Sequence, residues 1–437
     1  MFPSACIAPE HRSYGARRYF PVAVKSHLDR GEYVLLRDLL IVCTVGFSYH
    51  TASSAVKVLV PLYCASLGAP VGMIGIVVGA QSLLPLFLAV PAGGLADRVG
   101  FRTVTLVGGF CMCLAAVVFY ISGSIYPLIT GQVLGGLGEL SVWLCAQAAI
   151  TGIGDSTSKA RYLGYFGFAI ALGQAAGPGM AGFAADLTGY RNAFLLPLAF
   201  SVLVLVAALR MPNIEAGVQA PDESETTGIR DRRGFLAQFA QAGGLLQQPR
   251  TRAALLCTFV MIFTKTVRQS FFPVLLRGYG YSASTIGMLV SLMEGSSTVV
   301  RLFLGSMLKV LREDTLLLAG MVLGITATTI TPLTMSLPLL AIGSLIAGIG
   351  VGLNLPLTMS LIAGDAPERL RGLAMGIRLT GNRAAQFVSP VIFGVMGRWL
   401  NLGTSFYVVG GLLFLGTAAA GALLRQARQG ARAGEIT

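Results

Sequence analysis

Residues 93–102 read GGLADRVGFR, a short polar stretch that separates two long apolar runs. The stretch GSMLKVLR follows 212 residues later, so that Gly305 matches Gly93 and Lys309 matches Asp97. Further matches at the same offset, without a gap, are Pro61 with Pro273, Gly68 with Gly280, and Ile74-Gly75 with Ile286-Gly287. A repeat of this length is too long for a solenoid unit and indicates a duplicated helical bundle. In an apolar chain, duplicated halves are typical of a transporter.

Composition indicates a membrane protein. The chain is 54% hydrophobic and only 12% charged, and its mean hydropathy is +0.73, whereas a soluble domain carries about 25% charged residues. We therefore predict a polytopic protein of the lipid bilayer. The seven cysteines lie mostly in apolar runs, without the spacing of a disulfide framework or a metal site. We expect no cofactor or metal, and no nucleophile–base set indicates an enzyme.

Twelve segments have the length and apolar character of a membrane span, which takes about 20 residues. They are residues 38–62, 71–95, 103–122, 125–150, 161–184, 192–210, 253–276, 283–307, 315–334, 337–362, 372–396 and 404–424. A polar interruption at 211–251 separates six spans from six. The sequence thus predicts an all-α membrane protein with 12 transmembrane helices in two six-helix repeats.

The basic residues predict the orientation in the membrane. The net charge is +13, yet only Arg191, Arg277 and Arg398 fall in outer loops, against 23 Lys and Arg in cytoplasmic tails and loops. By the positive-inside rule, both termini are cytoplasmic. We expect a multi-pass protein of a bacterial inner membrane, and the clustering of the charge in alternate loops argues against a nucleic-acid partner.

The sequence predicts that the chain divides into five parts. We predict a cytoplasmic basic tail at 1–37, an N-terminal half at 38–210, a cytoplasmic linker at 211–251, a C-terminal half at 252–424 and a cytoplasmic tail at 425–437. Within the linker, Phe235, Phe239 and Leu246 recur at roughly helical spacing, which predicts a helix on the cytoplasmic membrane face. We expect a monomer.

The opening stretch resembles the signature loop between spans two and three of the major facilitator superfamily. The resemblance rests on Gly93, Asp97, Arg98, Gly100 and Arg102. The family pattern, Gly-x-Leu-Ala-Asp-Arg-x-Gly-Arg-Lys, differs here at Phe101 and Arg102. The resemblance covers about residues 38–424 and implies the 12-span fold, close to the drug/metabolite:proton antiporter group. It also implies a charge network that closes a cytoplasmic gate. In the second half, Gly305 and Lys309 are the matching residues, and Arg301, which lies nearby, is also assigned to the gate. An ordinary tight loop with solvated charges is the alternative.

Residues 173–182, GQAAGPGMAG, resemble the span-five motif that the superfamily associates with antiporters. Gly173, Gly177, Pro178 and Gly182 would kink this helix and let a neighbour pack closely. Pro390 and Gly394 lie at the repeat offset of 212 from the last two. The resemblance favours export by antiport.

Span four departs from the exporter pattern, because Gln132 stands where exporters usually place an arginine. Glu139 follows one or two turns later. Either proton coupling has moved to Glu139 or it is absent. Glu139 and Glu294 are the carboxylates inside spans, and both are candidate proton carriers.

Charged residues inside spans are the candidates for a central site, since each costs about 2.5–3.5 kcal/mol at mid-membrane. The resemblance implies a cavity lined by spans one, four, seven and ten, supported by five, eight and eleven. Lys265 and Arg268 are three residues apart, so we expect them to share a helix face, where the two like charges repel unless an anion or a carboxylate lies between them. The remaining candidates for the cavity are Tyr49, His50, Lys57, Glu139, Trp143, Gln269, Asn354, Arg378, Asn382 and Arg383.

Several of these residues have a structural alternative. Lys57 either lines the cavity or reaches the outer interface, and Arg383 either binds substrate or pairs with Glu294. His50 and Trp143 suit packing as well as a site. Arg301 lies near the cytoplasmic end of its span, which favours the gate.

The sequence predicts a secondary active transporter that exports an anionic or amphipathic small molecule in exchange for protons, by alternating access. A siderophore-like secreted metabolite or a drug fits this description. An importer of organic anions by proton symport is the alternative, and a transporter-like sensor is a third hypothesis. No Walker-type motif is present, which argues against ATP as the energy source.

Overall fold

The computed structural model describes residues 30–153, 158–211, 248–365 and 371–434, and all regular structure in these ranges is helical. The predicted interfacial helix at Phe235, Phe239 and Leu246 lies outside the described residues. The first half comprises α1 (Arg30–Ser66), α2 (Val71–Ala80), α3 (Leu83–Val99), α4 (Phe101–Ile121), α5 (Ile125–Thr151), α6 (Lys159–Thr188), α7 (Tyr190–Ala193) and α8 (Leu195–Leu209). The second comprises α11 (Pro249–Gly278), α12 (Ala283–Val310), α13 (Glu313–Thr329), η2 (Thr331–Leu333), α14 (Leu337–Asp365), α15 (Arg371–Trp399) and α16 (Leu402–Gly434).

Eleven segments of the described chain are long and apolar enough to cross a membrane. The remaining predicted span, 372–396, coincides with α15, which carries Arg378 and Arg383 in its middle. This helix packs on α2 and α11 inside the bundle, where its arginines are shielded from lipid. The fold is therefore the expected all-α bundle of two six-span halves. Two helices extend past the predicted ends, because α1 begins at Arg30 and α16 continues to Gly434.

The second predicted span, 71–95, is two helices rather than one. The chain turns at Gln81 and Ser82, between α2 and α3. Pro85 explains the break, since proline has no N–H to donate to the carbonyl four residues earlier and its ring clashes with that carbonyl. The freed Gln81 carbonyl lies against Gly136, where a Cβ would have no room. The break thus places two polar side chains in the middle of the bundle.

The internal repeat is visible in the contacts between the halves. Gly75 of α2 packs on the backbone of Pro390 in α15, and Gly287 of α12 packs on the backbone of Pro178 in α6. These two contacts exchange under the offset of 212. The turns at Gly68 and Gly280, also equivalent, have φ of 75° and 88°, a conformation that glycine adopts without strain. The two halves are therefore related by an approximate two-fold axis.

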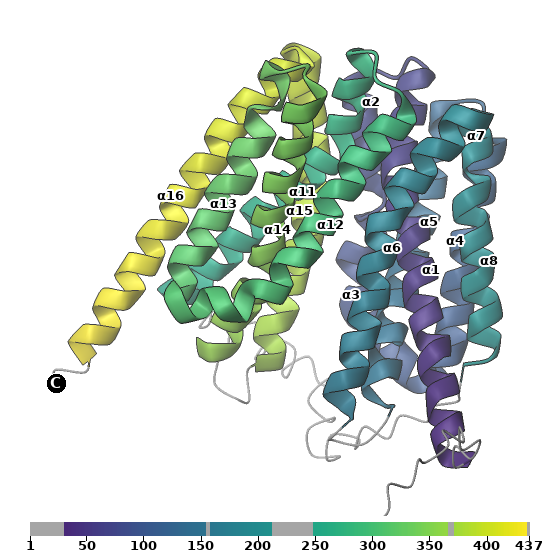
Figure 1. Cartoon of the computed structure of the whole chain (residues 1–437), viewed down its shortest axis with the longest axis horizontal. Helices are drawn as coiled ribbons and strands as arrows, with labels where there is room; N and C mark the ends of the chain where they lie inside the picture. The colour runs from purple at the N-terminus through teal and green to yellow at the C-terminus, as the bar shows by residue number, and fades with distance from the viewer. Residues whose placement is uncertain (1–29, 154–157, 212–247, 366–370, 435–437) are drawn as a thin grey trace, which may run out of the picture.

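The halves meet at one end of the molecule. The contacts of α6 with α12 and of α2 with α15 lie at the helix ends farthest from Arg30 and Gly434. Figure 1 shows the ribbons of the two halves approaching at the top and diverging toward the bottom, where α1 begins and α16 ends. We call the lower side the termini side and the upper side the closed side.

Candidate transport site

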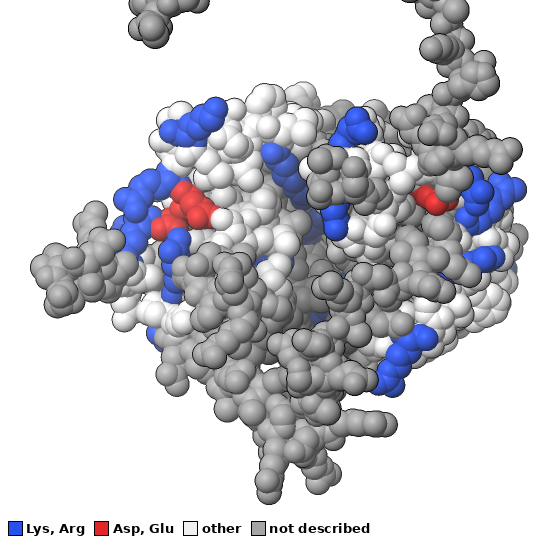
Figure 2. All heavy atoms as spheres, turned by 90° about the horizontal axis from the view of Figure 1, so that it is seen from below, with Lys and Arg blue, Asp and Glu red and all other residues white. Residues whose placement is uncertain are grey.

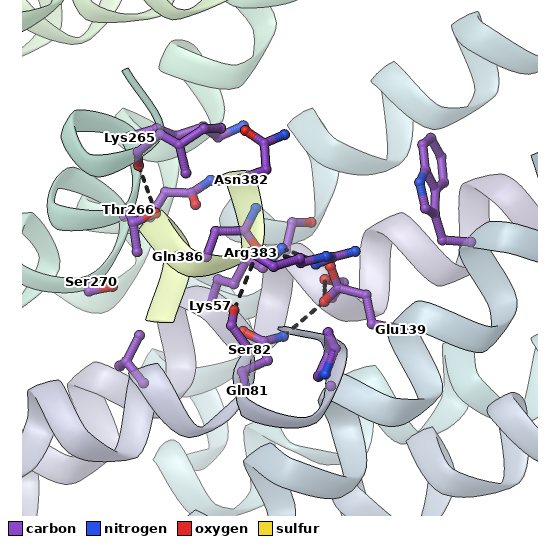
Figure 3. A pocket seen from close by; sticks show the side chains of 18 of the residues that line it. Lys57, Gln81, Ser82, Glu139, Lys265, Thr266, Ser270, Asn382, Arg383 and Gln386 are labelled. Carbon is purple, nitrogen blue, oxygen red and sulfur yellow. Dashed lines mark hydrogen bonds and ion pairs between the residues drawn. The ribbon is translucent and has the colours of Figure 1, made fainter. Parts of the chain in front are cut away.

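A polar cavity of about 240 Å³ lies between the halves. Its walls come from α1, α3, α5 and α6 of the first half, α11, α12 and α15 of the second, and the break after α2. Ten of the predicted residues line it: Tyr49, His50, Lys57, Glu139, Trp143, Lys265, Gln269, Glu294, Asn382 and Arg383. The structure thus gathers most of the intramembrane charges in one place (Figure 3).

Glu139 is held by three residues of its own half. Lys57 Nζ lies 3.5 Å from its Oε1. Ser53 Oγ and Gln81 Nε2 donate hydrogen bonds to Oε2 at 3.0 and 2.9 Å. Lys57 therefore pairs inside the cavity, which resolves the alternative that it reaches the outer interface. Gln81 is available to Glu139 because span two breaks at that residue.

Glu294 is held in the same manner in the second half. Lys265 Nζ lies 3.1 Å from its Oε1, and Gln269 Nε2 donates to the same oxygen at 2.7 Å. At the offset of 212, Ser53 matches Lys265 and Lys57 matches Gln269. Each half thus uses two side chains one turn apart, one lysine and one neutral donor, to bind a single carboxylate.

Arg383 does not pair with Glu294, because Lys265 occupies that carboxylate. Its Nη1 donates to Gln386 Oε1 at 3.1 Å, and Ser82 at the break donates to the same oxygen at 3.4 Å. This contact joins the two halves in the middle of the bundle (Figure 3).

Three aromatic rings of the first half form one wall of the cavity. The His50 and Trp143 rings meet edge to face, with centroids 5.2 Å apart, and the Tyr49 ring lies 4.4 Å from His50. His50 Nδ1 is 3.2 Å from Gln174 Nε2, and its buried Nε2 has no partner among the described residues. Packing and cavity lining are therefore combined in these side chains.

The prediction that Arg268 lines the cavity is wrong. Its guanidinium donates to Ala327 O, Thr331 Oγ1 and Ser344 Oγ at 3.0–3.2 Å, and it stacks 4.4 Å over the Phe272 ring. The side chain is 2% exposed and lies inside the second half. Lys265 and Gln269, which are four residues apart, face the cavity instead. Arg268 is only three residues from Lys265, and its side chain therefore lies at the other edge of the same helix face.

Asn354 and Arg378 also lie outside the cavity, contrary to prediction. Asn354 Nδ2 donates to Cys257 O at 3.5 Å, and Arg378 donates to Thr358 Oγ1 at 3.2 Å. Both contacts join α14 to its neighbours within the second half. Span ten therefore contributes no cavity residue among those described, whereas the break in span two contributes Gln81 and Ser82.

The predicted gate residues make contacts within their own halves. Gly100, with φ of 93°, forms the tight turn between α3 and α4, and Arg102 Nη2 donates to Leu209 O at 2.6 Å. Arg301 Nε donates to Gly352 O at 3.2 Å. Arg98 and Lys309 are exposed, Gly305 has open space around it, and Gly93 and the Asp97 side chain fall outside the description. The gate role stays a prediction.

The glycine-rich stretch of α6 packs against two helices at once. A Cβ at Gly173 or Gly177 would strike the backbone of α1, and one at Gly182 would strike Ala283 of α12. The backbone N–H of Gly179 also donates to Ser291 Oγ of α12 at 2.9 Å. The motif therefore brings α6 close to the other half on the closed side.

Sequence reasoning missed several polar cavity residues, among them Ser53, Gln81, Ser82, Gln132 and Gln174. Two signals were present. Pro85 predicts the break that exposes Gln81 and Ser82, and Gln174 lies at the repeat offset of 212 from Gln386, which faces the same cavity.

A bundle of two pseudo-symmetric halves around a polar central cavity defines a secondary transporter. The chain belongs to the Major Facilitator Superfamily, whose family model matches residues 42–253 and again 254–435. This is a family of transporters and not of enzymes.

Individual relatives are distant. An uncharacterized MFS-type transporter of Methanocaldococcus jannaschii is 20% identical over 380 residues, covering 85% of this chain and 94% of the relative. The quinolone resistance protein NorA of Staphylococcus aureus is 25% identical over 170 residues, which are 39% of this chain and 42% of NorA. Among solved structures, a mutant of the nucleoside transporter NupG superposes with a TM-score of 0.75 at 12% identity, covering 88% of this chain and 99% of that one.

Proposed function

We propose that the protein exports a small anionic or amphipathic molecule, such as a siderophore-like secreted metabolite or a drug, in exchange for protons. The supporting observation is the cavity between the halves, which three cationic side chains and two carboxylates line. A site at the interface of two repeats can open to either side by rocking of the halves, which is alternating access.

The charge distribution supports an orientation with both termini in the cytoplasm of a bacterial cell. By helix direction, Arg191, Arg277 and Arg398 lie on the closed side. Figure 2, seen from the termini side, has Lys and Arg in several places and few Asp or Glu. With this orientation the helix ends at which the two halves diverge face the cytoplasm (Figure 1).

Export is favoured by the antiporter-like stretch of α6 and by the partial similarity to NorA. In an antiporter, proton and substrate compete for one site, so that each shifts the occupancy of the other. Glu139 and Glu294 are the carboxylates of the cavity, and we assign proton binding to them.

The direction can be tested without knowledge of the substrate. Metabolites inside and outside a deletion strain are compared with those of its parent by mass spectrometry. An exporter leaves one compound accumulated inside the deletion strain and depleted outside. Accumulation outside with depletion inside contradicts export.

Import by proton symport is the second candidate, and the lysine–glutamate pairs favour it. An anion that binds Lys57 or Lys265 releases the carboxylate partner, which then binds a proton more readily. Anion and proton would then load together. Uptake of the identified compound into energised right-side-out vesicles supports symport, whereas uptake into energised inside-out vesicles supports antiport.

A further inference from the structure

Three cations and two carboxylates line the cavity, so its lining carries one positive charge in excess. Lys57 and Lys265 each lie within 3.5 Å of a glutamate. No carboxylate of the described residues lies within 4.0 Å of the Arg383 guanidinium. Arg383, on the wall that α15 provides, is therefore the cavity cation without an ion pair in the described structure, and Glu139 acts on it only at longer range.

Arg383 is also incompletely hydrogen-bonded. The residue is 8% exposed, and its Nε is buried without a partner among the described residues. In the described part of the chain, Nη1 donates a hydrogen bond to Gln386 Oε1 at 3.1 Å. A buried guanidinium with free donors is costly, and a carboxylate that accepts two parallel hydrogen bonds satisfies it best. Asn382, the next cavity residue, likewise has a buried Oδ1 without a partner in the described structure.

The aromatic wall lies one to two helical turns from this charge. Trp143 follows Glu139 by one turn on α5, and His50 precedes Lys57 by two turns on α1, which places the rings about 5–10 Å toward the termini side. In Figure 3, Arg383 extends to the region of Glu139 and Lys57. The cavity of about 240 Å³ lies just below the range of about 300–1,000 Å³ that is usual for ligand sites. These dimensions suit a molecule of one or two rings.

We infer that the cavity binds an aromatic carboxylate, with its acid group on Arg383 and its ring beside His50 and Trp143. This inference rests on the proposed function and narrows its substrate class. The ring gains stacking and edge contacts with the aromatic wall. The acid group supplies the acceptors that Arg383 lacks. An acid that enters from the termini side passes the rings and reaches the arginine at the deeper end.

The probes are 2-naphthoate, its neutral analogue 2-naphthamide, and cyclohexanecarboxylate, an acid without an aromatic ring. Binding to the purified full-length protein is measured by isothermal titration calorimetry. Arg383→Gln should weaken 2-naphthoate about 10- to 100-fold, the loss of a charge-assisted pair, and leave the weak binding of 2-naphthamide unchanged. Arg383→Lys keeps the charge without the two-pronged contact and should weaken 2-naphthoate less.

The predicted contact between the ring of the ligand and the aromatic wall is tested with a variant of Trp143. Trp143→Leu should weaken 2-naphthoate several-fold and leave cyclohexanecarboxylate unchanged. Arg398 and Trp399, both exposed at the end of the same helix α15, provide matched controls. Arg398→Gln and Trp399→Leu should bind all three probes like the wild type.

Three results would overturn the inference: no binding of 2-naphthoate to the wild type, equal losses for acid and amide in Arg383→Gln, or full affinity in both Arg383 variants. Loss of binding with a shifted elution in gel filtration assigns Arg383 to folding and also overturns it. The proposed function is tested separately. If the protein exports in exchange for protons but its 2-naphthoate affinity does not depend on Arg383, the proposed function holds and the inference is wrong. If binding depends on Arg383 but no export is found, the inference holds and the proposed function is wrong.

Discussion

At the scale of single residues, Glu139 is the side chain on which the proposed coupling depends most. Both of its oxygens are occupied, by Lys57 on one side and by Ser53 and Gln81 on the other. Protonation would remove the charge that Lys57 compensates, leaving a free ammonium in the cavity. A proton on Glu139 therefore alters both the charge of the cavity and the contact with the span-two break.

Glu139→Gln removes the ionisable group and preserves the size and shape of the side chain. We expect transport by this variant to lose its dependence on the pH gradient while substrate exchange at equal pH continues. Counterflow and gradient-driven flux in proteoliposomes, with the compound that the deletion strain identifies, distinguish the two activities. Glu294→Gln serves as the comparison in the other half. Gradient-driven flux at the wild-type level in Glu139→Gln would exclude Glu139 from coupling.

Arg268 has a structural role, which predicts a different result. Arg268→Ala removes the donor from the buried Thr331 Oγ1 and Ser344 Oγ and one of the donors to Ala327 O, and each group left unsatisfied costs about 1–3 kcal/mol. We expect a lower thermal midpoint, measured by scanning fluorimetry, with 2-naphthoate affinity retained in the folded fraction. Arg277→Ala, which removes an exposed arginine of the same helix, should leave the midpoint unchanged. A wild-type midpoint for Arg268→Ala would contradict the structural role.

The residue predictions succeeded and failed for one physical reason. A charge in an apolar span signals a cavity or a partner, so Glu139 and Lys265 could be placed from sequence, whereas Lys57 was left open between the cavity and the outer interface. Whether a charged side chain lines the cavity or binds a partner elsewhere depends on the positions of helices that are distant in sequence. Arg268 meets acceptors from α13, η2 and α14, and no local spacing predicts that contact.

At the scale of elements, close glycine contacts hold the two halves together on the closed side. Gly287 packs on the Pro178 carbonyl and Gly75 on the Pro390 carbonyl. A Cβ at either glycine has no room, and backbone atoms cannot move aside as a flexible side chain can. The twelve spans were predictable from the length of the apolar segments. These contacts could have been predicted only by treating the sequence repeat as a two-fold symmetry that pairs helices of one half with helices of the other.

Gly287→Ala and Gly75→Ala should therefore weaken the contact on the closed side. Hydrogen–deuterium exchange is expected to increase in residues 67–70 and 279–284, which lie next to these contacts. Gly295→Ala is the matched control, since Gly295 lies in α12 with open space at its Cβ position. That variant should gain helix stability of up to about 1 kcal/mol without the change in exchange. Equal exchange in all three variants would contradict the role of the glycines.

At the scale of the whole molecule, the repeat is symmetric in packing and asymmetric in charge. Asp186 at the end of α6 accepts hydrogen bonds from the N–H groups of Ala283 and Ser284, at 3.0 and 2.7 Å. It thereby caps the N-terminus of α12 across the boundary between the halves. Its equivalent at the offset of 212 is Arg398, which cannot cap a helix N-terminus. The contact between α6 and α12 thus includes a carboxylate cap on a helix N-terminus, which the contact between α2 and α15 lacks.

Asp186→Asn keeps a capping oxygen and removes the charge that favours a helix N-terminus, whereas Asp186→Ala removes both. Because Asp186 is exposed, we expect the alanine variant to weaken the contact between the halves by about 0.5–1 kcal/mol. The population in which the halves are separated on the closed side should then increase two- to fivefold.

Spin labels at the exposed residues Leu195 and Leu333, in a cysteine-free background, report the separation of the halves by pulsed electron resonance. The long-distance population should rise from wild type to Asn to Ala. Asp314→Asn is the control, since Asp314 pairs with Arg428 within one half and its loss should leave the distribution unchanged. An unaltered distribution in Asp186→Ala would show that apolar and glycine packing alone set the equilibrium between the two states.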